Sequence, residues 1–297
     1  MPVNWCEELG TVLSNDEVVD GKSERGGYPV IRKNMKQLCI DQAAFAERLL
    51  EGLNEIDWPE STKEMQRHWI GRSTGVEVQF EIVGGGKFSI FTTCIETIYG
   101  ITFMVLAPDG ELVQELMPRI KNQDEVKAYI QETISKSEMD RTELNKGKTG
   151  CRLEGIKAIN PVNGREVEVF IGDFVLANYG TGAVMAVPSH DQRDFEYAIA
   201  HNIDMIQVIE GQDVSEHAFE KQDYLGKGCK LINSEEFTGL TVEEAKVAIT
   251  KKLVDMGIAK ETVNYRFREW IFARQRYWGE PVPIVHLEDG TDYVLPD

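Results

Sequence analysis

Residues 179–194 constrain the fold of this chain more than any other segment; they read Tyr-Gly-Thr-Gly-Ala-Val-Met-Ala-Val-Pro-Ser-His-Asp-Gln-Arg-Asp. The two glycines predict a turn, and the apolar run that follows predicts a buried strand. Pro188 ends that strand, because proline has no amide hydrogen to donate to a neighbouring strand. A strand that passes directly into a polar helix start indicates a fold that combines a sheet with helices.

The helix start after this strand carries a cluster of polar side chains. Ser189 and Gln192 have the spacing of a capping box, so we expect the helix to begin at Ser189. His190, Asp191 and Asp194 then project from its first turns. Folds of the α/β type often hold a polar site at such a place, just beyond a strand end.

The composition is that of an ordinary globular protein. A chain of 297 residues that is 42% hydrophobic and 28% charged can bury a sizeable core, in one large or two smaller domains. No apolar run reaches the length of a membrane span, and the first residues lack the pattern of a signal peptide. We therefore expect no membrane partner and a cytoplasmic location.

The cysteines and the net charge narrow the class of function. Five scattered cysteines without a Cys-x-x-Cys pair indicate neither a disulfide framework nor a zinc site, and we expect no metal. The formal net charge of −18 predicts a surface that repels nucleic acid overall, since such affinity depends mainly on neutralised phosphates. Any contact with RNA must therefore be local or must involve other domains.

Two hairpins are predicted. Residues 76–82 alternate apolar and polar side chains, a Gly-Gly-Gly turn follows, and residues 88–92 run back. Asn163-Gly164, between two apolar runs, predicts a second hairpin with a turn of the two-residue type. Further strands of the same sheet are expected at residues 174–176 and 184–187.

The predicted helices surround this sheet. They are expected at residues 40–53, from residue 58, at about residues 123–137, and from residue 241 to just before residue 257. Ser61 with Glu64, and Thr241 with Glu244, repeat the capping-box spacing. The charged residues 138–148 are expected to form a mobile loop. The sum is a mixed α+β, barrel-like β domain with surrounding helices.

Several segments together resemble one family, the leucyl-tRNA synthetases of bacterial type. Residues 179–194 closely resemble the second site segment of the hydrolytic editing insertion of these enzymes. Residues 69–73, 91–100 and 274–281 resemble its entry strand, its threonine-rich segment and the return into the catalytic domain. The resemblance implies an N-terminal arm at residues 1–70, a barrel-like editing domain at 71–258, and a C-terminal return arm at 259–297.

The two ATP-handling signatures of that enzyme class are not found in the sequence. We see no His-Ile-Gly-His, no Lys-Met-Ser-Lys-Ser and no glycine-rich phosphate loop. We therefore expect no ATP site, no cofactor and no activation of an amino acid. The chain resembles the middle of a synthetase with short arms, and the expected partner is the 3′ end of tRNA(Leu), bound by a monomer.

Editing is needed because binding alone distinguishes similar amino-acid side chains only weakly. A hydrophobic pocket separates side chains that differ by one methylene by only about 1–3 kcal/mol, so a second site must hydrolyse mischarged products. Such a site needs a group that binds the α-ammonium of the substrate. It also needs a steric gate against leucine and polar groups that hold a water near the ester carbonyl.

The resemblance assigns these roles to particular residues. It implies that Thr92, Thr93, Asp191 and Asp194 form the catalytic group, in which Asp194 pairs with the α-ammonium. The two threonines would bind the terminal ribose or the water. Thr97 would be the gate, because a β-branched side chain is stiff. The expected pocket lining is Tyr179, Met185, Val187 and His190.

The same residues also have purely structural readings. Thr92 and Thr93 fit an ordinary strand end, because threonine is common in strands. Asp191 fits a residue that is favoured by the helix dipole, and Asp194 fits a carboxylate that faces solvent. A single histidine at a helix start, such as His190, is more often structural or exposed than catalytic.

One departure from the family pattern raises a second hypothesis. Where the family reads Thr-Thr-Arg-Pro-Asp-Thr, this chain has Thr-Thr-Cys-Ile-Glu-Thr at residues 92–97. Cys94 replaces the arginine that would meet the RNA end. It is a candidate nucleophile of a small-ester hydrolase with a histidine such as His190 as base, and equally a small buried hydrophobe. Natural divergence, engineering and an inert binding module stay open as explanations.

Overall fold

The computed structural model describes residues 2–135, 141, 149–177, 181–267, 269–272, 278 and 282–296. The chain divides into two compact units, which are described separately. One is Gly71–Arg266; the other combines Met1–Ile70 with Phe267–Asp297. Within the described residues, no helix has both the length and the apolar character that a membrane span requires.

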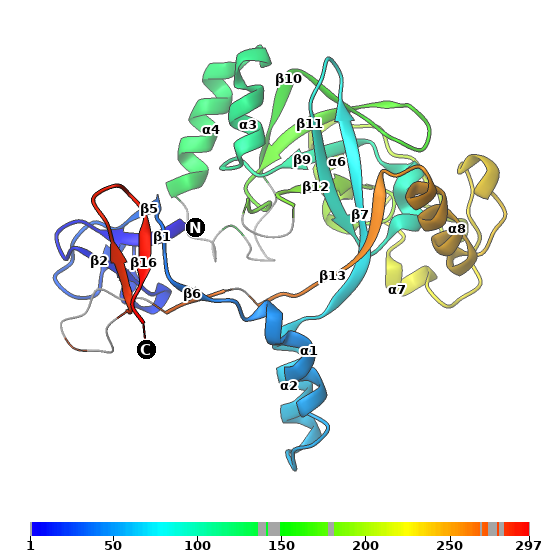
Figure 1. Cartoon of the computed structure of the whole chain (residues 1–297). Coiled ribbons are helices and arrows are strands. Elements are labelled where there is room, and N and C mark those ends of the chain that lie inside the picture. The colour runs from blue at the N-terminus through cyan, green and yellow to red at the C-terminus, as the bar shows by residue number, and fades with distance from the viewer. Residues whose placement is uncertain are drawn as a thin grey trace. The chain divides into compact units, whose positions relative to one another are not determined.

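A seven-stranded sheet forms the centre of the larger unit (Figure 1). Its strands are β7 Ser73–Ile82, β8 Lys87–Thr92, β9 Phe103–Leu106, β10 Gly150–Ile159, β11 Glu166–Gly172, β12 Ala183–Ala186 and β13 Ala259–Asn264. They lie in the order β12-β9-β11-β10-β7-β13, and β8 pairs with β7 as well. All pairs are antiparallel except β9 with β11. Because β12 also lies beside β8, the sheet curves round on itself, as expected of a barrel-like mixed α+β fold.

The β7–β8 hairpin is confirmed, and its sequence explains it. The apolar residues of β7 from Val76 to Ile82 are buried and face the core, while the residues between them are partly or fully exposed. The turn consists of three glycines, and each has a φ between +83° and +107°. Other residues rarely adopt that backbone conformation, so the turn depends on glycine.

The β10–β11 hairpin is also confirmed, but its predicted two-residue turn is wrong. The strand register ends at Ile159 opposite Glu166, and one further hydrogen bond, from the Asn160 amide to the Arg165 carbonyl at 2.8 Å, closes a loop of four residues. Pro161 has no amide hydrogen for a ladder, and the Asn160 amide oxygen instead accepts a hydrogen bond from the Val162 amide at 3.2 Å. Proline therefore decided where pairing stops, rather than the Asn-Gly pair.

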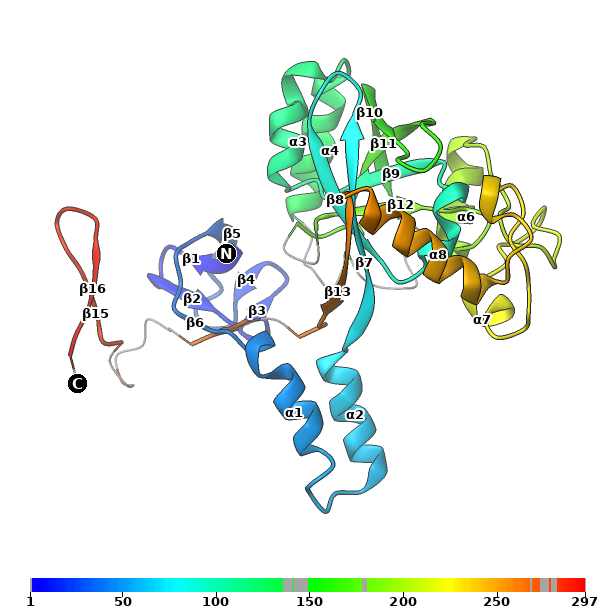
Figure 2. The same ribbon diagram turned by 45° about the vertical axis from the view of Figure 1, so that its right-hand side comes forward.

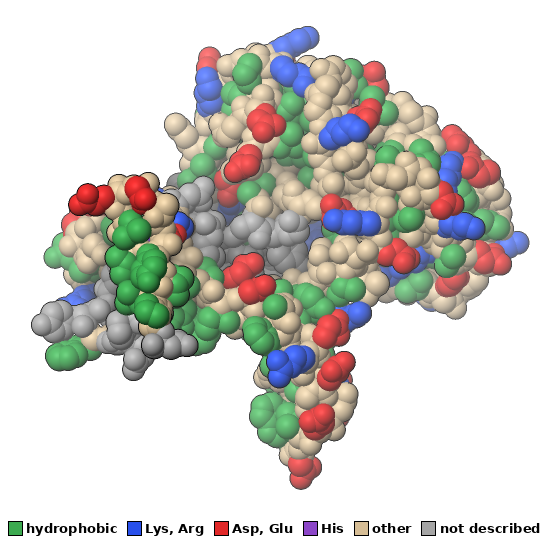
Figure 3. Space-filling view, in the orientation of Figure 1, with side chains coloured by type: hydrophobic (Ala, Val, Ile, Leu, Met, Phe, Trp, Pro, Cys, Tyr) green, Lys and Arg blue, Asp and Glu red, His purple; other side chains and the backbone are tan. Residues whose placement is uncertain are grey.

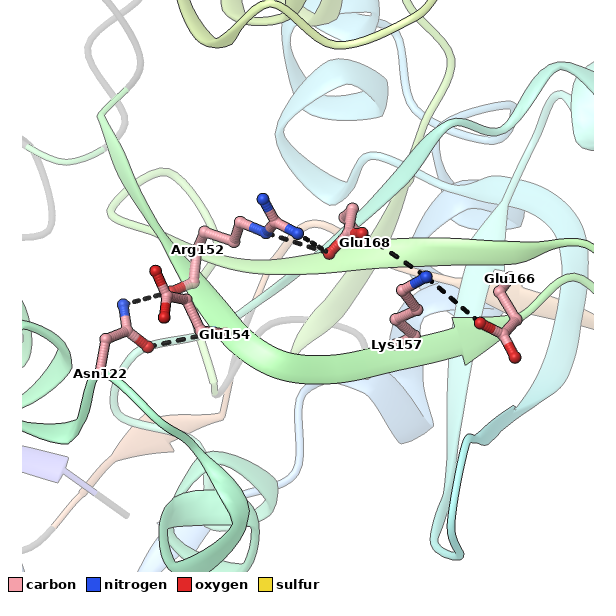
Figure 4. Close-up of polar contacts among 6 residues, drawn as sticks. All are labelled: Asn122, Arg152, Glu154, Lys157, Glu166 and Glu168. Atoms are coloured by element: carbon pink, nitrogen blue, oxygen red, sulfur yellow. Dashed lines mark hydrogen bonds and ion pairs between the residues drawn. The ribbon is translucent and has the colours of Figure 1, made fainter.

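The β10 strand contains a bulge between Arg152 and Lys157 that a side chain stabilises (Figure 4). The Asn122 amide nitrogen donates to the Arg152 carbonyl oxygen at 2.9 Å, and the Glu154 amide donates to the Asn122 amide oxygen at 3.0 Å. Backbone groups that the bulge removes from the ladder are thus paired. On either side of the bulge, ion pairs join β10 to β11: Arg152 with Glu168, and Lys157 with Glu166.

One predicted strand does not form, and part of the sheet was not predicted. Residues 174–176 form no strand; the chain turns at Gly172, whose carbonyl accepts from the Val175 amide. Two strands of the sheet were not predicted, β13 and β9; β9 lies between β12 and β11, and all four of its residues are buried. A strand that is covered on both faces has no alternation to recognise, and a short apolar run is ambiguous without its neighbours.

Helices cover the sheet of this unit (Figure 2). Their bounds are η3 Ile95–Gly100, α3 Glu111–Leu116, η4 Met117–Arg119, α4 Gln123–Ser135, α6 Gln192–His201, α7 Lys221–Tyr224, η5 Glu235–Phe237 and α8 Val242–Asp255. The helix α4 packs on β10, and α8 packs on β13 and η3. The predicted Thr241–Glu244 capping box of α8 is present in both directions. The expected mobile loop at 138–148 lies outside the described residues apart from Arg141.

The smaller unit contains short elements. Their bounds are β1 Pro2–Cys6, β2 Thr11–Leu13, η1 Asn15–Glu17, β3 Val18–Val19, β4 Lys22–Ser23, β5 Ile31–Asn34, β6 Cys39–Ile40, η2 Ala43–Phe45, α1 Ala46–Gly52, α2 Glu60–Ile70, β14 Trp270–Ile271, β15 Ile284–His286 and β16 Asp292–Val294. Its largest sheet has the order β2-β1-β5. The predicted Ser61–Glu64 capping box is wrong, because α2 already begins at Glu60 and the amide of Thr62 donates to the Pro59 carbonyl.

Candidate functional site

The threonine-rich segment forms a tight turn between β8 and η3. The Thr92 hydroxyl oxygen accepts a hydrogen bond from the Cys94 amide at 3.0 Å. The Thr97 hydroxyl donates to the Cys94 carbonyl at 2.9 Å, and the Thr97 amide donates to the same oxygen at 3.1 Å. Two of the three threonine hydroxyls therefore hold the shape of the turn. The Thr93 hydroxyl lies 3.6 Å from the Cys94 sulfur.

The second predicted segment caps α6 differently from the sequence-based expectation. Asp191, not Ser189, is the N-cap: its Oδ1 accepts from the amides of Arg193 and Asp194 at 2.9 and 3.1 Å. Ser189 is buried, and its hydroxyl has no partner among the described residues. The Ser189–Gln192 capping box is therefore wrong. A carboxylate at the N-cap suits the positive end of the helix dipole better than a hydroxyl.

Asp194 ties the start of α6 back to the end of β12. Its side chain is buried, and its Oδ2 accepts from the Val187 amide at 3.0 Å. This bond fixes the carboxylate just beyond the strand end. The sequence-based reading of Asp194 as a solvent-facing residue is thus wrong, because the residue is only 8% exposed.

The structure brings the two segments together. A Cβ atom on Gly100, at the end of η3, would lie 3.0 Å from a methyl carbon of Val187, so any larger residue there would have to push Val187 away. Nearby, the Thr102 amide donates to the Ala186 carbonyl at 3.3 Å. The end of the threonine turn and the strand that leads to Asp194 are therefore in direct contact.

His190 is held by backbone groups on both sides of its ring. Its Nδ1 lies 3.0 Å from the Phe219 carbonyl, and its Nε2 accepts from the Val208 amide at 3.0 Å. This pattern assigns the proton to Nδ1. Burial lowers the pKa of His190 to about 4. Because neither ring nitrogen is left to take a proton from the Cys94 thiol, the cysteine–histidine hypothesis has no support here.

The predicted lining residues are placed only in part. Met185 is half-buried on β12 opposite Met104 of β9, and Val187 is buried. Tyr179 lies outside the described residues. Their contact with a substrate therefore stays a prediction.

Glu96, Tyr224 and Lys246 stabilise the threonine turn through contacts that the sequence analysis did not predict. Glu96 is fully buried in η3, and its Oε1 accepts from the Tyr224 hydroxyl at 3.2 Å. Burial raises the pKa of the Glu96 carboxyl, an effect that the positive charges of Lys246 and Lys221 oppose. The Lys246 ammonium donates to the Thr93 carbonyl at 3.0 Å. Tyr224 and Lys246 are more than a hundred residues away in sequence, so no local pattern could have identified them.

The chemistry that this arrangement offers is binding and positioning. It supplies carboxylates at a helix start and hydroxyls in a rigid turn. Over the residues that the structure describes, no three His, Cys, Asp or Glu side chains come together as a possible metal site. A buried, oriented carboxylate is suited to a cationic ligand group, because the low local dielectric strengthens such a pair.

Comparison with known proteins identifies the family of the chain. The model of a protein family described as the leucyl-tRNA synthetase editing domain matches residues 67–254. The chain is also similar to the agnB2 LeuRS of Agrobacterium radiobacter K84, solved as a ternary complex with tRNA and LeuAMS. The two share 29% sequence identity with a TM-score of 0.75, over the full length of this chain. This chain spans 33% of the length of that protein.

Proposed function

Because the chain belongs to the leucyl-tRNA synthetase editing-domain family, we propose that it hydrolyses the aminoacyl ester of mischarged tRNA(Leu). The observation that supports this proposal is the approach of Gly100, which ends η3, to Val187, which follows β12. We propose that this approach brings Thr97 and Asp194, which are distant in sequence, into one site. The chain has no ATP-handling signature, so the proposal does not include activation of an amino acid.

In this proposal, Asp194 binds the α-ammonium of the substrate. Its burial and its bond to the Val187 amide support the role, because they orient the carboxylate before the substrate arrives. Asp191 contributes mainly as the cap that fixes the first turn of α6. Met185 and Val187 line the side-chain pocket.

Thr97 is the proposed gate against leucine. Its hydroxyl donates a hydrogen bond to the Cys94 carbonyl. This bond fixes χ1 and therefore the position of the methyl group. Thr92 keeps the turn in shape through the Cys94 amide, and Thr93 is the threonine whose hydroxyl is proposed to meet the terminal ribose or the attacking water. No nucleophilic side chain is required, since the positioned water attacks the ester carbonyl.

The acidity of the chain limits how it can meet tRNA. With a net charge of −18, long-range attraction to phosphates is absent, and the proposed contact is confined to the 3′ end. Figure 3 shows basic side chains interspersed with acidic ones on the viewed face of the Gly71–Arg266 unit, without a broad basic surface. We expect weak binding of tRNA, and so a high KM.

The test is a deacylation assay on isoleucyl- and norvalyl-tRNA(Leu), with leucyl-tRNA(Leu) alongside. The wild-type chain should hydrolyse the first two and spare the third. Asp194→Ala should lower kcat/KM by on the order of 10²–10³-fold, since losing one partner of a buried charge pair costs about 2–5 kcal/mol. Asp204→Ala, at an exposed carboxylate that follows α6, is the matched control and should behave as wild type.

A wild-type chain that hydrolyses none of these esters contradicts the proposal. If the wild-type chain is active and Asp194→Ala keeps its full activity, Asp194 is not the ammonium ligand. The gate is tested separately: Thr97→Ala should admit leucyl-tRNA(Leu), whereas Thr97→Val, which keeps the branched shape, should still reject it. Rejection of leucine by Thr97→Ala would remove Thr97 from that role.

A further inference from the structure

Tyr224 touches both segments of the candidate site. It is the last residue of α7, only 1% of its surface is exposed, and its hydroxyl donates to Glu96 in the threonine turn. Its ring meets the His190 ring edge-on, with 6.0 Å between ring centroids and an interplanar angle of 85°. His190 belongs to the opposite segment of the site, residues 179–194, so the Tyr224 side chain contacts both segments.

The Tyr224 ring is itself fixed in place. The Phe219 ring packs against it with 5.7 Å between centroids. The carbonyl of Phe219 lies against the His190 ring nitrogen, as described above. Tyr224, Phe219 and His190 thus form a closed group in which each member holds another, and the Tyr224 hydroxyl is aimed by that group.

Glu96 needs this hydroxyl. Its side chain is fully buried, and its Oε2 has no partner among the described residues. A buried polar group that loses a hydrogen bond is strongly disfavoured, so the turn keeps the conformation in which Glu96 meets Tyr224. Glu96 directly precedes Thr97, the proposed gate. The charged and titratable groups that face Glu96 are Tyr224 and Lys221 from α7 and Lys246 from α8, while Cys94 faces Tyr224.

We propose that Tyr224 is a positioning residue, whose hydroxyl acts through Glu96 to set the threonine turn relative to the start of α6. The inference rests on the proposed hydrolysis and extends it to residues that contact no substrate. Packing of the Tyr224 ring against His190 fixes Tyr224 beside the α6 segment. The hydrogen bond from its hydroxyl to Glu96 then fixes the turn relative to that segment. Removing the hydroxyl alone therefore releases the turn while the ring packing stays.

The first measurement needs no catalysis. Cys94 lies in the turn, so its rate of alkylation by iodoacetamide, followed by peptide mass spectrometry, reports the turn's conformation. Tyr224→Phe should raise that rate about three- to tenfold, as expected when one buried hydrogen bond is lost. Tyr197→Phe is the matched control: Tyr197 is also buried in the same unit, but its hydroxyl has no partner among the described residues. It should leave the rate unchanged.

The second measurement is deacylation of isoleucyl-tRNA(Leu). Tyr224→Phe should lower kcat about tenfold with KM nearly unchanged, because the turn acts on the transition state rather than on tRNA binding. Glu96→Gln retains an oxygen that can accept from Tyr224 and should keep most of the activity. Glu96→Ala should match Tyr224→Phe. The double variant Tyr224→Phe/Glu96→Ala should be no worse than either single one.

The outcomes separate the two proposals. Equal Cys94 labelling in wild type, Tyr224→Phe and Tyr197→Phe overturns the inference, whether or not the chain is active. Increased labelling with unchanged kcat also overturns it. A wild-type chain without deacylase activity contradicts the proposed function, while the labelling still decides whether Tyr224 positions the turn. If Glu96→Gln behaves as Glu96→Ala, Glu96 is not the link.

Discussion

The two compact units of this chain differ in how they treat their large hydrophobic side chains. In the Gly71–Arg266 unit, one buried cluster runs from β7 through the sheet to α8. Its exposed large hydrophobics among the described residues are Ile134, Val184, Ile199, Leu225, Val247, Val254 and Met256. The smaller unit exposes many more, and the aromatic ones are Tyr28, Phe45, Trp58, Trp69, Trp270, Phe272, Trp278 and Tyr293.

This difference indicates which unit gains more free energy of folding from apolar burial. Burial of apolar area contributes about 25 cal/mol per Å², so a unit that buries its aromatic side chains gains far more than one that leaves them in water. The larger unit therefore holds the site on a rigid frame. The smaller unit buries few large hydrophobic side chains among its described residues, so we expect it to gain less free energy of folding from apolar burial.

The largest expected effect is a separation of the two unfolding transitions. All five tryptophans, Trp5, Trp58, Trp69, Trp270 and Trp278, belong to the smaller unit. In a urea titration, the change in tryptophan fluorescence should occur well before the change in far-UV circular dichroism, which the larger unit dominates. Native-state hydrogen exchange should show a difference of at least about 3 kcal/mol between the units. Coincident transitions by both methods would break the comparison.

A matched pair of isoleucine substitutions tests the same contrast at single positions. Ile90 of β8 is fully buried, whereas Ile31 of β5 in the smaller unit is 54% exposed. Ile90→Ala should lower the free energy of unfolding by about 2–5 kcal/mol, because it removes a buried side chain and leaves a cavity. Ile31→Ala should change it by less than about 1 kcal/mol. Similar losses for both variants in urea unfolding would count against the comparison.

The pH dependence of stability should follow His190. Its pKa is lowered to about 4 by burial, whereas the unfolded chain takes up the proton near pH 6.5. The contribution is therefore fully present above about pH 6.5 and is lost as the pH falls toward 4. At pH 5 it should have lost about 2 kcal/mol.

The measurement compares urea unfolding of wild type and variants at pH 7.5 and 5.0. His190→Gln should be less stable than wild type at pH 7.5 and lose less on acidification. His68→Gln, at an exposed position in α2 of the smaller unit, should track wild type at both values. If His190→Gln and wild type lose the same amount between the two pH values, the buried neutral histidine is not the cause.

The smallest effect concerns two predicted helix caps, one in each unit. The Thr241–Glu244 box of α8 is formed, so Thr241→Ala should cost about 1 kcal/mol. Ser61 lies inside α2 and caps nothing, so Ser61→Ala should change stability by less than about 0.5 kcal/mol. Thermal unfolding followed by circular dichroism measures both. A larger loss for Ser61→Ala than for Thr241→Ala would reverse the expectation.

The elements that the sequence predicted well are those with a local cause. The β7–β8 hairpin follows from alternation and from three glycines, and α8 follows from a capping box and Gly257. The chain's resemblance to an editing domain was also local, because four short segments carried it. Predictions failed where a nonlocal partner decided: β9 is covered on both faces, and residues 174–176 lose their pairing at a turn.

The candidate site shows the same division. Its threonines, Asp191 and Asp194 were visible in the sequence, because short motifs place hydroxyls at a strand end and carboxylates at a helix start. Their roles were not visible. Asp191 replaced Ser189 as the cap, and His190 turned out to hold backbone groups on both sides of its ring. Tertiary packing determines which hydrogen-bond partner each of these side chains has.

The local sequence was sufficient to identify the β7–β8 hairpin, the capped helix α8 and the family of this chain, since each depends on short segments. Only the tertiary structure decided that Gly100 meets Val187 and that Tyr224 reaches Glu96. Those contacts join residues far apart in the chain. The Gly100–Val187 contact comes from close packing, whereas the Tyr224–Glu96 hydrogen bond forms because burying a polar group without a partner is disfavoured, and both constraints act only once the sheet has closed around the core.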